Sequence, residues 1–390
     1  MKHRILALML ALVMAFGMMA CSVPAAEESA APSESPAATL PPLPEADLSV
    51  DVLTFSANIA PDYVIATING EEISAEFFLY WLTINCNYFM NNYGAYFDMA
   101  DYNDMMIEDS VSLTVYYTTL AQKCMELGCP LTDEQLTELQ AAIDELGEET
   151  YEQQKLLYGL SDESIHKIFA MDYQYQNLMD TLIPVPTAEE LNSYAYQAKH
   201  ILIATATEGA DGTVTLATGQ AATNEDGTPW TGTADEYNAA ALAKAEDLLA
   251  QIRASEDTAA TFDALMHEHS EDGRDADGNL GAPDGYTTTV GQMVAEFEQA
   301  ALALEVGGVS DLVQSTYGYH IILRGEVENI EQYADAYRQT QLDALVTQWM
   351  EEAEVVRTAE LDAIDSVDFF NRMYIYQSAL LDTFEAETEE

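Results

Sequence analysis

The sequence predicts a multidomain chain in which a small α+β segment lies between two mostly helical segments. Two aliphatic strands frame the α+β segment, residues 198–203 (Ala-Lys-His-Ile-Leu-Ile) and 315–323 (Ser-Thr-Tyr-Gly-Tyr-His-Ile-Ile-Leu), and each carries one histidine. Apolar residues recur at helical spacing through much of the chain on either side of them. The domain boundaries are therefore expected near the two ends of this segment.

Residues 1–20 have the features of a lipoprotein signal peptide. Lys2 and Arg4 precede an apolar run that is shorter than the roughly 18–20 residues needed to cross a bilayer. The run ends in Met-Met-Ala before Cys21, which resembles a lipobox, so Cys21 is the expected lipidation site. An ordinary secretory signal with an incidental cysteine is the alternative. Several acyl chains on Cys21 would anchor the protein stably to the outer face of the cytoplasmic membrane.

Residues 21–56 are predicted to be an acidic tether rich in proline, alanine and serine. They hold six of the twelve prolines in the chain and no lysine or arginine. A segment of this composition cannot bury enough apolar surface to offset the entropy lost on ordering. We therefore expect it to connect the anchor to the folded part of the chain.

The chain is extremely acidic, with 68 acidic and 13 basic residues and a formal net charge of −55. This charge argues against nucleic acid and anionic lipid surfaces as partners. Two explanations remain open. The charge keeps an exported protein soluble at high local concentration, or it favours basic client polypeptides or loosely held divalent cations.

Apart from Cys21, the cysteines are Cys86, Cys124 and Cys129, an odd number that gives no complete disulfide framework. Cys86 lies in an apolar helical run and is expected to be a small core residue. A bridge between Cys124 and Cys129 stays open as a possibility that the count alone does not support.

Residues 57–195 are predicted to form an N-terminal helical domain. It opens with a hairpin over residues 64–73, whose Asn69-Gly70 turn is a strong hairpin signal, and Ser74 then begins a helix. Further helices are expected at 107–127, 132–147, 150–158 and 161–181, with a last short helix that begins after Thr187.

Residues 196–326 are predicted to contain the element order β-α-α-α-β-β. The stretch 206–234, rich in glycine, threonine and aspartate, is expected to form a hairpin-like excursion after the first strand. Helices follow at 239–253, 261–269 and 294–304. In the remaining residues, 327–390, the pattern predicts two helices at 329–354 and 358–386.

Three further motifs lie between the two histidine strands. They are Ser270-Glu271-Asp272, Gly278-Asn279-Leu280-Gly281 and residues 291–297, Gly-Gln-Met-Val-Ala-Glu-Phe. Together with the strands they resemble a parvulin-type peptidyl-prolyl cis/trans isomerase over residues 196–326. The opening Ile-Asn-Gly-Glu-x-Ile followed by a helix resembles the N-terminal domain of PrsA/SurA-type foldases. The resemblance implies an α+β parvulin domain inserted in a mostly α-helical SurA-like chaperone domain, with residues 327–390 packing on residues 57–195.

The chemistry implied by this resemblance is rotation about X-Pro bonds. Partial double-bond character gives the amide a rotational barrier of roughly 18–20 kcal/mol, although the two isomers differ by only about 0.5–1 kcal/mol. A catalyst must hold the proline ring, remove the amide from water and favour the twisted state. It therefore needs no nucleophile, no metal and no small-molecule cofactor.

The resemblance assigns four residues to the catalytic centre. His200 and His320 match the paired histidines of the family, Asp272 matches a position that is cysteine or aspartate across the family, and Ser315 stands where threonine is usual. The rings of the two histidines are expected to hydrogen-bond to each other on neighbouring strands. A chiefly structural role of the pair in maintaining the fold remains the alternative.

The same resemblance assigns an apolar pocket for the proline ring. Leu280, Met293 and Phe297 align with the pocket of the family, and the spacing of four places Met293 and Phe297 on one helix face. Tyr286 is expected as an aromatic wall. Tyr317 is expected in the final strand and completes the candidate substrate-binding residues.

Other apparent motifs predict no further site. His267 and His269 are two residues apart, which places their rings on different faces of a helix and disfavours a metal site. The run Asp275-x-Asp277-Gly278 lacks the first acid and the closing glutamate of a calcium loop and predicts a turn. Residues 204–243 contain no lysine or arginine, so a phosphate group would find no partner after the first histidine strand.

The sequence thus predicts a lipid-anchored isomerase and chaperone that acts on unfolded or partly folded exported polypeptides containing X-Pro bonds and is not phospho-directed. One alternative is a client-holding chaperone lipoprotein with a non-catalytic parvulin fold. The substitutions at Ser315 and Asn279 and the long 206–234 stretch leave room for it. Another is a lipoprotein that binds a solute or a cation.

Overall fold

The computed structural model describes residues 44–388 except 95, 225–226 and 275–277. The predicted signal peptide, Cys21, most of the tether and the two acids of the Asp275-x-Asp277 turn lie outside the described residues. The chain forms two compact units: unit 1 consists of the residues up to 183 together with 341–390, and unit 2 consists of residues 184–340.

A three-stranded antiparallel sheet lies in unit 1, in the order β2-β1-β9. The predicted hairpin over residues 64–73 is confirmed: β1 (Val64–Ile68) pairs with β2 (Glu71–Ser74) through a turn in which Asn69 and Gly70 both have positive φ, as a tight hairpin requires. The third strand, β9 (Val355–Arg357), falls between the two helices predicted after residue 327 and pairs with β1 from the far end of the chain.

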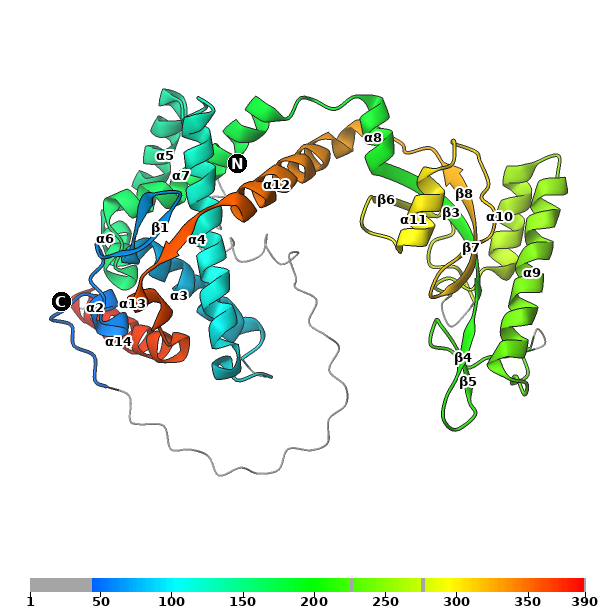
Figure 1. Ribbon diagram of the computed structural model, residues 1–390, viewed down its shortest axis with the longest axis horizontal. Coiled ribbons are helices and arrows are strands. Elements are labelled where there is room, and N and C mark those ends of the chain that lie inside the picture. The colour runs from blue at the N-terminus through cyan, green and yellow to red at the C-terminus, as the bar shows by residue number, and fades with distance from the viewer. Residues whose placement is uncertain (1–43, 95, 225–226, 275–277, 389–390) are drawn as a thin grey trace. The chain divides into compact units, whose positions relative to one another are not determined.

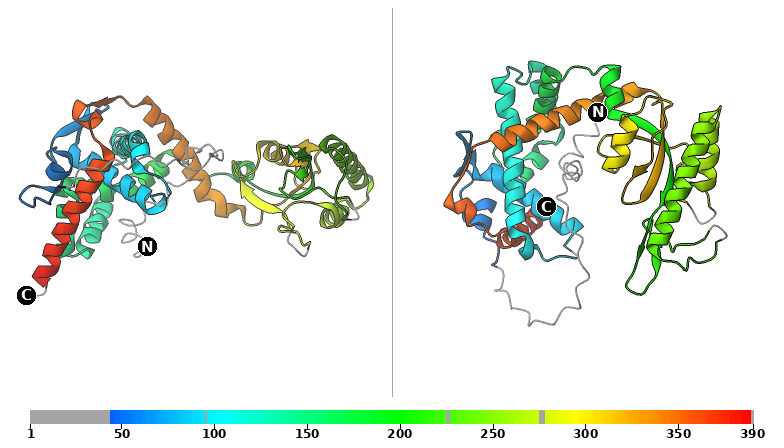
Figure 2. Two further views of the ribbon diagram at one scale, coloured as in Figure 1. Left: turned by 90° about the horizontal axis from the view of Figure 1, so that it is seen from below. Right: turned by 45° about the vertical axis from the view of Figure 1, so that its right-hand side comes forward.

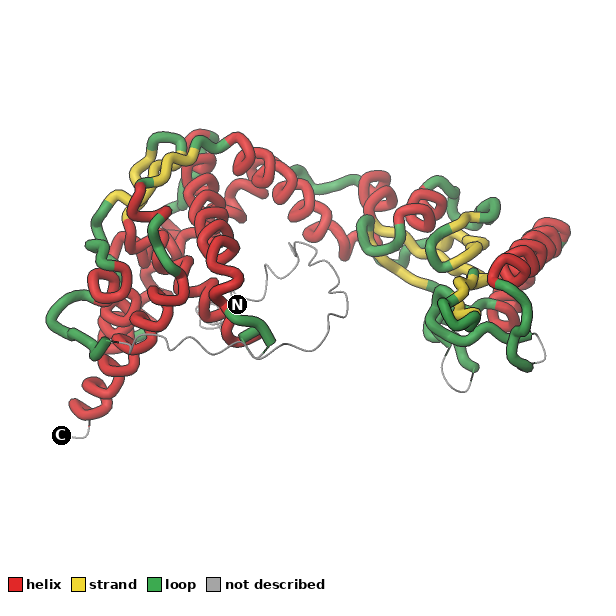
Figure 3. Tube along the Cα trace, turned by 60° about the horizontal axis from the view of Figure 1, so that its bottom comes forward, coloured by secondary structure: helices red, strands yellow, loops and turns green. Residues whose placement is uncertain are grey.

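The rest of unit 1 is helical, as Figures 1 and 3 show. Its long helices are α3 (Ala75–Asn92), α4 (Asn103–Glu126), α5 (Asp133–Glu145), α6 (Glu148–Tyr158), α7 (Asp162–Leu182), the C-terminal part of α12 (Ala334–Glu352) and α14 (Ser366–Thr388). Short turns are α2 (Val52–Ala57), η1 (Met99–Tyr102) and α13 (Ala359–Asp362). The predicted helix 358–386 is thus interrupted, because α13 ends at Asp362 and α14 begins only at Ser366.

Helix α2 corrects the predicted extent of the tether. The range 21–56 includes Val52 and Leu53, but both side chains are buried in the core of unit 1. Asp51 begins the helix, since its carboxylate accepts hydrogen bonds from the backbone N–H groups of Leu53 and Thr54. The helix packs against α14, so two segments more than 300 residues apart in the sequence hold each other in place.

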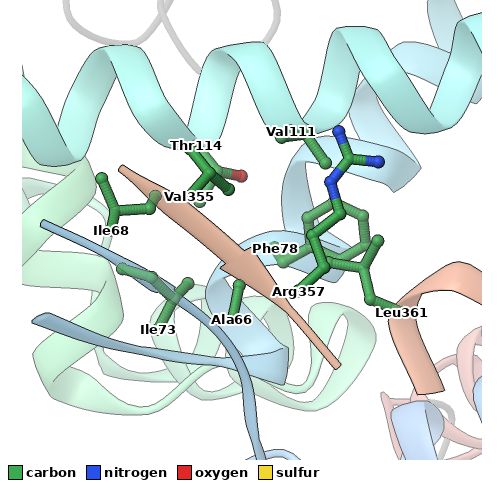
Figure 4. Close-up of a pocket in the computed structure, with 9 residues that line it drawn as sticks. All are labelled: Ala66, Ile68, Ile73, Phe78, Val111, Thr114, Val355, Arg357 and Leu361. Atoms are coloured by element: carbon green, nitrogen blue, oxygen red, sulfur yellow. The ribbon is translucent and has the colours of Figure 1, made fainter. Parts of the chain in front are cut away.

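The sheet of unit 1 packs beneath α4, as Figure 4 shows for the side chains at this contact. Ile68 and Ile73 from the hairpin and Val355 from β9 line a small apolar gap under Val111 of α4. At its edge, the guanidinium of Arg357 donates two hydrogen bonds to the carboxylate of Glu108, at 2.6 and 2.5 Å. This bidentate pair ties β9 to α4.

A four-stranded antiparallel sheet forms the centre of unit 2, in the order β6-β3-β8-β7. Its members are β3 (Ala195–Ala204), β6 (Tyr286–Thr289), β7 (Val313–Gln314) and β8 (Gly318–Gly325). Strand β6 was not predicted. The element order around the sheet is β-α-α-β-α-β-β, with one strand more than expected before the third helix.

Helices cover both faces of this sheet (Figure 1). Because side chains alternate along a strand, Ile201, Ile203 and Ile321 pack against α9 (Ala234–Ala254) and α10 (Thr258–His269). Tyr196, Ala198 and Ile322 face the opposite way and pack against α11 (Ala295–Leu302). His200 and His320 lie on this second face.

Within the predicted excursion over 206–234, residues 206–216 form a hairpin of β4 (Ala206–Glu208) and β5 (Val214–Leu216), which continues from the end of β3 (Figure 2). Its apolar residues form a small cluster of their own with Trp230 and Tyr237. The side-chain amide of Asn238 on α9 accepts a hydrogen bond from the N–H of Ala206 at 2.7 Å and donates one to its carbonyl at 3.0 Å. The hairpin is therefore fixed to α9.

Both ends of unit 2 extend beyond the predicted domain limits of 196 and 326. The short helix α8 (Ala188–Tyr194) packs on η2 (Ile330–Tyr333). The ring of Tyr194 contacts that of Tyr337 with centroids 5.5 Å apart, and its hydroxyl lies 3.2 Å from that of Thr340. These contacts hold the segments that enter and leave the sheet within one unit.

Candidate active site

The two predicted histidines meet on the α11 side of the sheet in unit 2. In the β3–β8 register His200 lies opposite Ile322 and His320 lies opposite Leu202, so the histidines are diagonal neighbours on one face. Their Nδ1 atoms are 3.1 Å apart and their rings are nearly parallel, at 11°. Both side chains are buried.

Gly318 permits this close approach of the two strands. Its φ is +144°, and a Cβ atom at this position would lie 2.3 Å from the carbonyl oxygen of Ile203. Any other residue would therefore push β8 away from β3 just before His320.

Asp272 reaches His200 because the two preceding residues are fixed to β3. The hydroxyl of the buried Ser270 accepts a hydrogen bond from the N–H of Leu202 at 3.1 Å. The N–H of Glu271 donates to the carbonyl of Leu202 at 2.8 Å, and its carboxylate accepts from the N–H of Ala204 at 2.7 Å. In the sequence Ser270 and Glu271 are visible only as parts of a motif, whereas their hydrogen bonds to β3 give them this positioning role.

The polar side chains of the site form one connected chain. Oγ of Ser315 lies 2.7 Å from Nε2 of His320, whose Nδ1 faces Nδ1 of His200. Nε2 of His200 lies 2.9 Å from Oδ2 of Asp272, a close polar contact that does not meet the geometry of a hydrogen bond. The hydroxyl of Tyr286 donates to the same carboxylate oxygen at 2.6 Å.

One proton arrangement satisfies this chain when both histidines are neutral. The Oγ of Ser315 accepts from the N–H of Tyr317 at 3.1 Å and donates its own proton to Nε2 of His320. His320 then carries its proton on Nδ1 and donates to His200, which leaves the Nε2 proton of His200 facing Asp272. The reverse direction would aim a bare ring nitrogen at a carboxylate.

The environment shifts three pKa values in this cluster. The contact with His200, aided by the hydroxyl of Tyr286, holds the pKa of Asp272 below its usual range. Burial, followed by the neighbouring His200, lowers the pKa of His320 to about 4. Burial and the hydrogen bond to Asp272 raise the pKa of Tyr286 to about 12. At neutral pH the cluster therefore holds an anionic Asp272, a neutral His320 and a neutral Tyr286.

An aromatic and sulfur-containing surface borders this cluster. The ring of Phe297 on α11 meets His200 edge to face at 5.1 Å between centroids and His320 at 5.7 Å. Met293 precedes α11, is half-buried and packs with Phe297 against the same apolar cluster. The structure therefore brings together two of the three residues assigned to the proline pocket.

Leu280 and Tyr317 lie differently from the other candidates. Leu280 packs against the cluster of β3, α9 and α10 on the other face of the sheet. Tyr317 was expected in the final strand but lies in the loop before β8, with its side chain 45% exposed, because the chain must turn at Ser315 before Gly318 enters the strand. Tyr286 was predicted only as an aromatic wall, and the structure shows that its hydroxyl also donates a hydrogen bond to Asp272.

Among the residues that the structure describes, three or more histidine, cysteine, aspartate or glutamate side chains nowhere form a group suited to hold a metal ion. No helix in the described ranges combines the length and apolar character needed to cross a membrane.

Comparison with protein families identifies this part of the chain. Residues 200–326 match the family described as "Rotamase: PPIC-type PPIASE domain". Unit 2 carries a parvulin-type peptidyl-prolyl isomerase domain. The isomerase domain contains all nine predicted catalytic and substrate-binding residues, and the match begins at His200 itself.

Curated relatives of the chain include foldases and a chaperone. The chain is 31% identical over 153 residues to the foldase protein PrsA of Oceanobacillus iheyensis, and this match covers 38% of the chain and 48% of the relative. It is 42% identical over 85 residues to PrsA of Geobacillus kaustophilus, covering 21% of the chain and 28% of the relative. The chaperone SurA of Chromohalobacter salexigens is 42% identical over 79 residues, 20% of the chain and 18% of the relative. The matches thus span half or less of the length of each relative.

Solved structures include a crystal structure of PrsA from Bacillus cereus, with 19% sequence identity and a TM-score of 0.35 over 80% of this chain and 99% of that one. A solution structure of TbPIN1 covers 33% of this chain and 96% of that one, at 22% identity and a TM-score of 0.23. At such scores the likeness supports no functional conclusion.

We predict that His320 stays neutral down to mildly acidic pH. Its folded pKa of about 4 lies below the ordinary value of 6.5, so the unfolded chain binds more protons between these values. The stability that His320 contributes is therefore complete above about pH 6.5 and is lost as the pH falls towards 4. NMR titration of the imidazole signals of the full chain measures this pKa, and His320→Asn assigns the signal. A titration midpoint at or above 6.5 would contradict the buried, neutral His320.

Proposed function

We propose that this protein is a peptidyl-prolyl cis/trans isomerase and folding chaperone for exported polypeptides. The observation that carries the proposal is the constellation of Asp272, His200 and His320 beside Met293 and Phe297, in a segment that matches the PPIC-type family. Polar groups that contact one another beside an apolar surface suit a reaction that needs a polarised site from which water is excluded.

The catalytic step is rotation about the C–N bond of an X-Pro amide. In the planar amide, conjugation moves electron density onto the carbonyl oxygen, and twisting the bond returns that density to nitrogen. Met293 and Phe297 hold the proline ring. The carboxylate of Asp272, kept ionised by its contact with His200, disfavours charge on a nearby carbonyl oxygen and so favours the twisted state over both planar ones.

The histidine pair and Ser315 act on this step through Asp272. The contacts from Ser315 through His320 orient the ring of His200, whose Nε2 then lies 2.9 Å from the carboxylate of Asp272. Tyr286 holds the same oxygen from the other side. These side chains are positioning residues, and Asp272 with the apolar pair is the part that meets the substrate.

The isomerase acts on ordinary rather than phosphorylated X-Pro segments. The β4–β5 hairpin continues directly from β3, and residues 204–243 contain no lysine or arginine that could pair with a phosphate. The acidic Asp272 at the site adds repulsion.

Client holding is assigned to an exposed aromatic surface in unit 1, here called the aromatic tip. It consists of Met90, Tyr93, Tyr96, Phe97 and Met105, all more than 40% exposed, and Tyr96 is 81% exposed. Two rings of the tip pack against aromatic side chains outside it. The ring centroids of Tyr93 and Phe89 are 5.9 Å apart, and those of Phe97 and Tyr102 are 5.7 Å apart. The rings of the tip are therefore held in place by their neighbours and remain exposed to solvent.

The charge around the aromatic tip indicates which clients it suits. Exposed Asp98, Asp101 and Asp104 lie within the same segment, and residues 44–122 contain no lysine or arginine. We assign to the tip unfolded segments that combine apolar side chains with lysine or arginine, because such segments match both its apolar surface and its negative charge.

The protein is assigned to the extracytoplasmic face of the membrane, held there by lipid on Cys21. The apolar run followed by Met-Met-Ala-Cys supports this location. Several acyl chains on one cysteine give stable anchoring, whereas a single chain binds only marginally.

We expect the full chain to accelerate proline-limited refolding and Met293→Ala to lower kcat/KM about tenfold, because truncating a pocket side chain removes on the order of 1–3 kcal/mol of contacts to the proline. Leu265→Ala, a similar truncation on the opposite face of the sheet, serves as the control and should retain the activity. Absence of rate enhancement by the folded wild-type chain would refute the catalytic proposal and favour a purely client-holding role.

For the aromatic tip, we expect Tyr96→Ser with Phe97→Ser to weaken suppression of aggregation of a basic unfolded client several-fold. Isomerase activity on a short peptide should not change. The matched control is Tyr374→Ser with Leu381→Ser, which removes exposed apolar side chains from α14 instead. Added salt should weaken the wild-type effect, since charge attraction is screened. Equal losses in both double variants would speak against a specific surface.

Replacement of the predicted lipidation site provides a separate test of location. Cys21→Ser should move the protein from the membrane fraction to the medium or periplasm and abolish incorporation of labelled palmitate. Cys86→Ser, which changes a cysteine buried in α3, should leave both unchanged. Retention of the Cys21→Ser variant in the membrane fraction would contradict a lipid anchor at this residue.

A further inference from the structure

The C-terminus of α4 ends in a Schellman motif that contains two cysteines. The N–H of Cys129 donates to the carbonyl of Cys124 at 2.9 Å, and the N–H of Gly128 donates to the carbonyl of Met125 at 3.3 Å. Gly128 has φ of +70°, the left-handed conformation that this motif requires. Leu127 is the last residue of the helix cap. These are the six-to-one and five-to-two hydrogen bonds that define the motif.

This motif brings two particular side chains together. An apolar contact between the residues at its first and last positions frequently accompanies the motif. Here these residues are Cys124 and Cys129, which the hydrogen bond from the N–H of Cys129 to the carbonyl of Cys124 holds at the two ends of one turn. The backbone that ends the helix thus holds two thiols next to each other, and both are reduced in this structure.

We propose that Cys124 and Cys129 form a preorganised dithiol, which a disulfide oxidant of the extracytoplasmic space converts into an intramolecular disulfide. The bridge would join the last turn of α4 to the segment that leads into α5. It accounts for the odd cysteine count, since Cys86 is fully buried in α3 and stays a core thiol.

The surroundings distinguish the two thiols. Cys124 is buried, and its Sγ donates to the carbonyl of Gln174 on α7 at 3.3 Å. Burial, followed by the neighbouring Cys129, raises the pKa of Cys124 to about 12. Cys129 is half-buried, and its carbonyl accepts a hydrogen bond from the side chain of Asn177 on α7. Cys129 is therefore the thiol that meets an oxidant first.

The exchange balances in two steps. The thiolate of Cys129 attacks an oxidant R–S–S–R, so a mixed disulfide on Cys129 forms and one thiolate RS⁻ leaves. Cys124 then attacks Sγ of Cys129 and expels the second RS⁻. The two protons of the protein thiols pass to the leaving groups, which gives two RSH and one protein disulfide.

A residue that contacts Cys124 also lines a pocket in unit 1. Helices α4 and α7 contribute Tyr117, Thr118, Met171 and Gln174 to its lining, and Gln174 is the residue whose carbonyl accepts from Cys124.

The test treats the reduced full chain with oxidised glutathione, traps the remaining thiols with a maleimide and identifies them by peptide mass mapping. We expect Cys124 and Cys129 to disappear together, without dimers, while Cys86 stays reactive after unfolding. Cys124→Ser should accumulate glutathione on Cys129, because the resolving thiol is missing. Cys129→Ser should leave Cys124 largely unreacted, and the control Cys86→Ser should still form the bridge.

Preorganisation is measured by repeating the equilibrium in concentrated urea. The equilibrium constant for bridging should be about tenfold or more larger in the folded chain, since the motif already holds the thiols in contact. An equal or smaller constant in the folded chain overturns the proposal. Persistence of both thiols in the folded chain under conditions that bridge the unfolded one, or first modification of Cys124, does the same.

Discussion

Antiparallel pairing of β3 with β8 brings His200 and His320 into contact although 120 residues separate them in the sequence. The rest of the candidate site is placed relative to this pair. Ser270 and Glu271 are hydrogen-bonded to β3 and so deliver Asp272 to His200. Ser315 reaches His320 from the loop just before β8. A single strand pairing therefore fixes the distances among His200, Asp272, Ser315 and His320.

The same pairing also separates two environments. Residues of β3 and β8 that point towards α9 and α10 are aliphatic and form a conventional core. Residues that point towards α11 include both histidines, and Phe297 covers them. Because a shift of one residue would exchange the two faces, the aliphatic core on one side holds the register on which the polar cluster on the other side depends.

Local sequence signals predicted the parts of the fold that local interactions determine. The Asn69-Gly70 turn and the helix expected from residue 132 formed as predicted, because the turn and the capping box of Thr132 and Gln135 depend on residues that are close in sequence. Strand β9 was missed, since three residues give no periodic pattern and their partner is β1, nearly 300 positions earlier. Helix α2 was assigned to the tether for the same reason: its stability comes from burial against α14 rather than from its own six residues.

The candidate site shows the same division. The residue types at 200, 272, 293, 297 and 320 were visible in the sequence through their resemblance to a family, and the structure brings these side chains together. The hydrogen bond from Tyr286 to Asp272 was not visible, because it requires β6 to pair with β3. The position of Leu280 on the other sheet face likewise follows from tertiary packing.

The contacts of Tyr194 with Tyr337 and Thr340 have a consequence for how the chain is built. They join the segment that enters unit 2 to the segment that leaves it, using only residues of unit 2. An inserted unit whose two ends are held together by its own side chains presents its host with a short gap to span, so the host is able to fold around it without loss of its own core. These contacts make the unit self-contained. Circularly permuted or transplanted forms that keep Tyr194 and Tyr337 therefore retain the contact that holds the entering and leaving segments together.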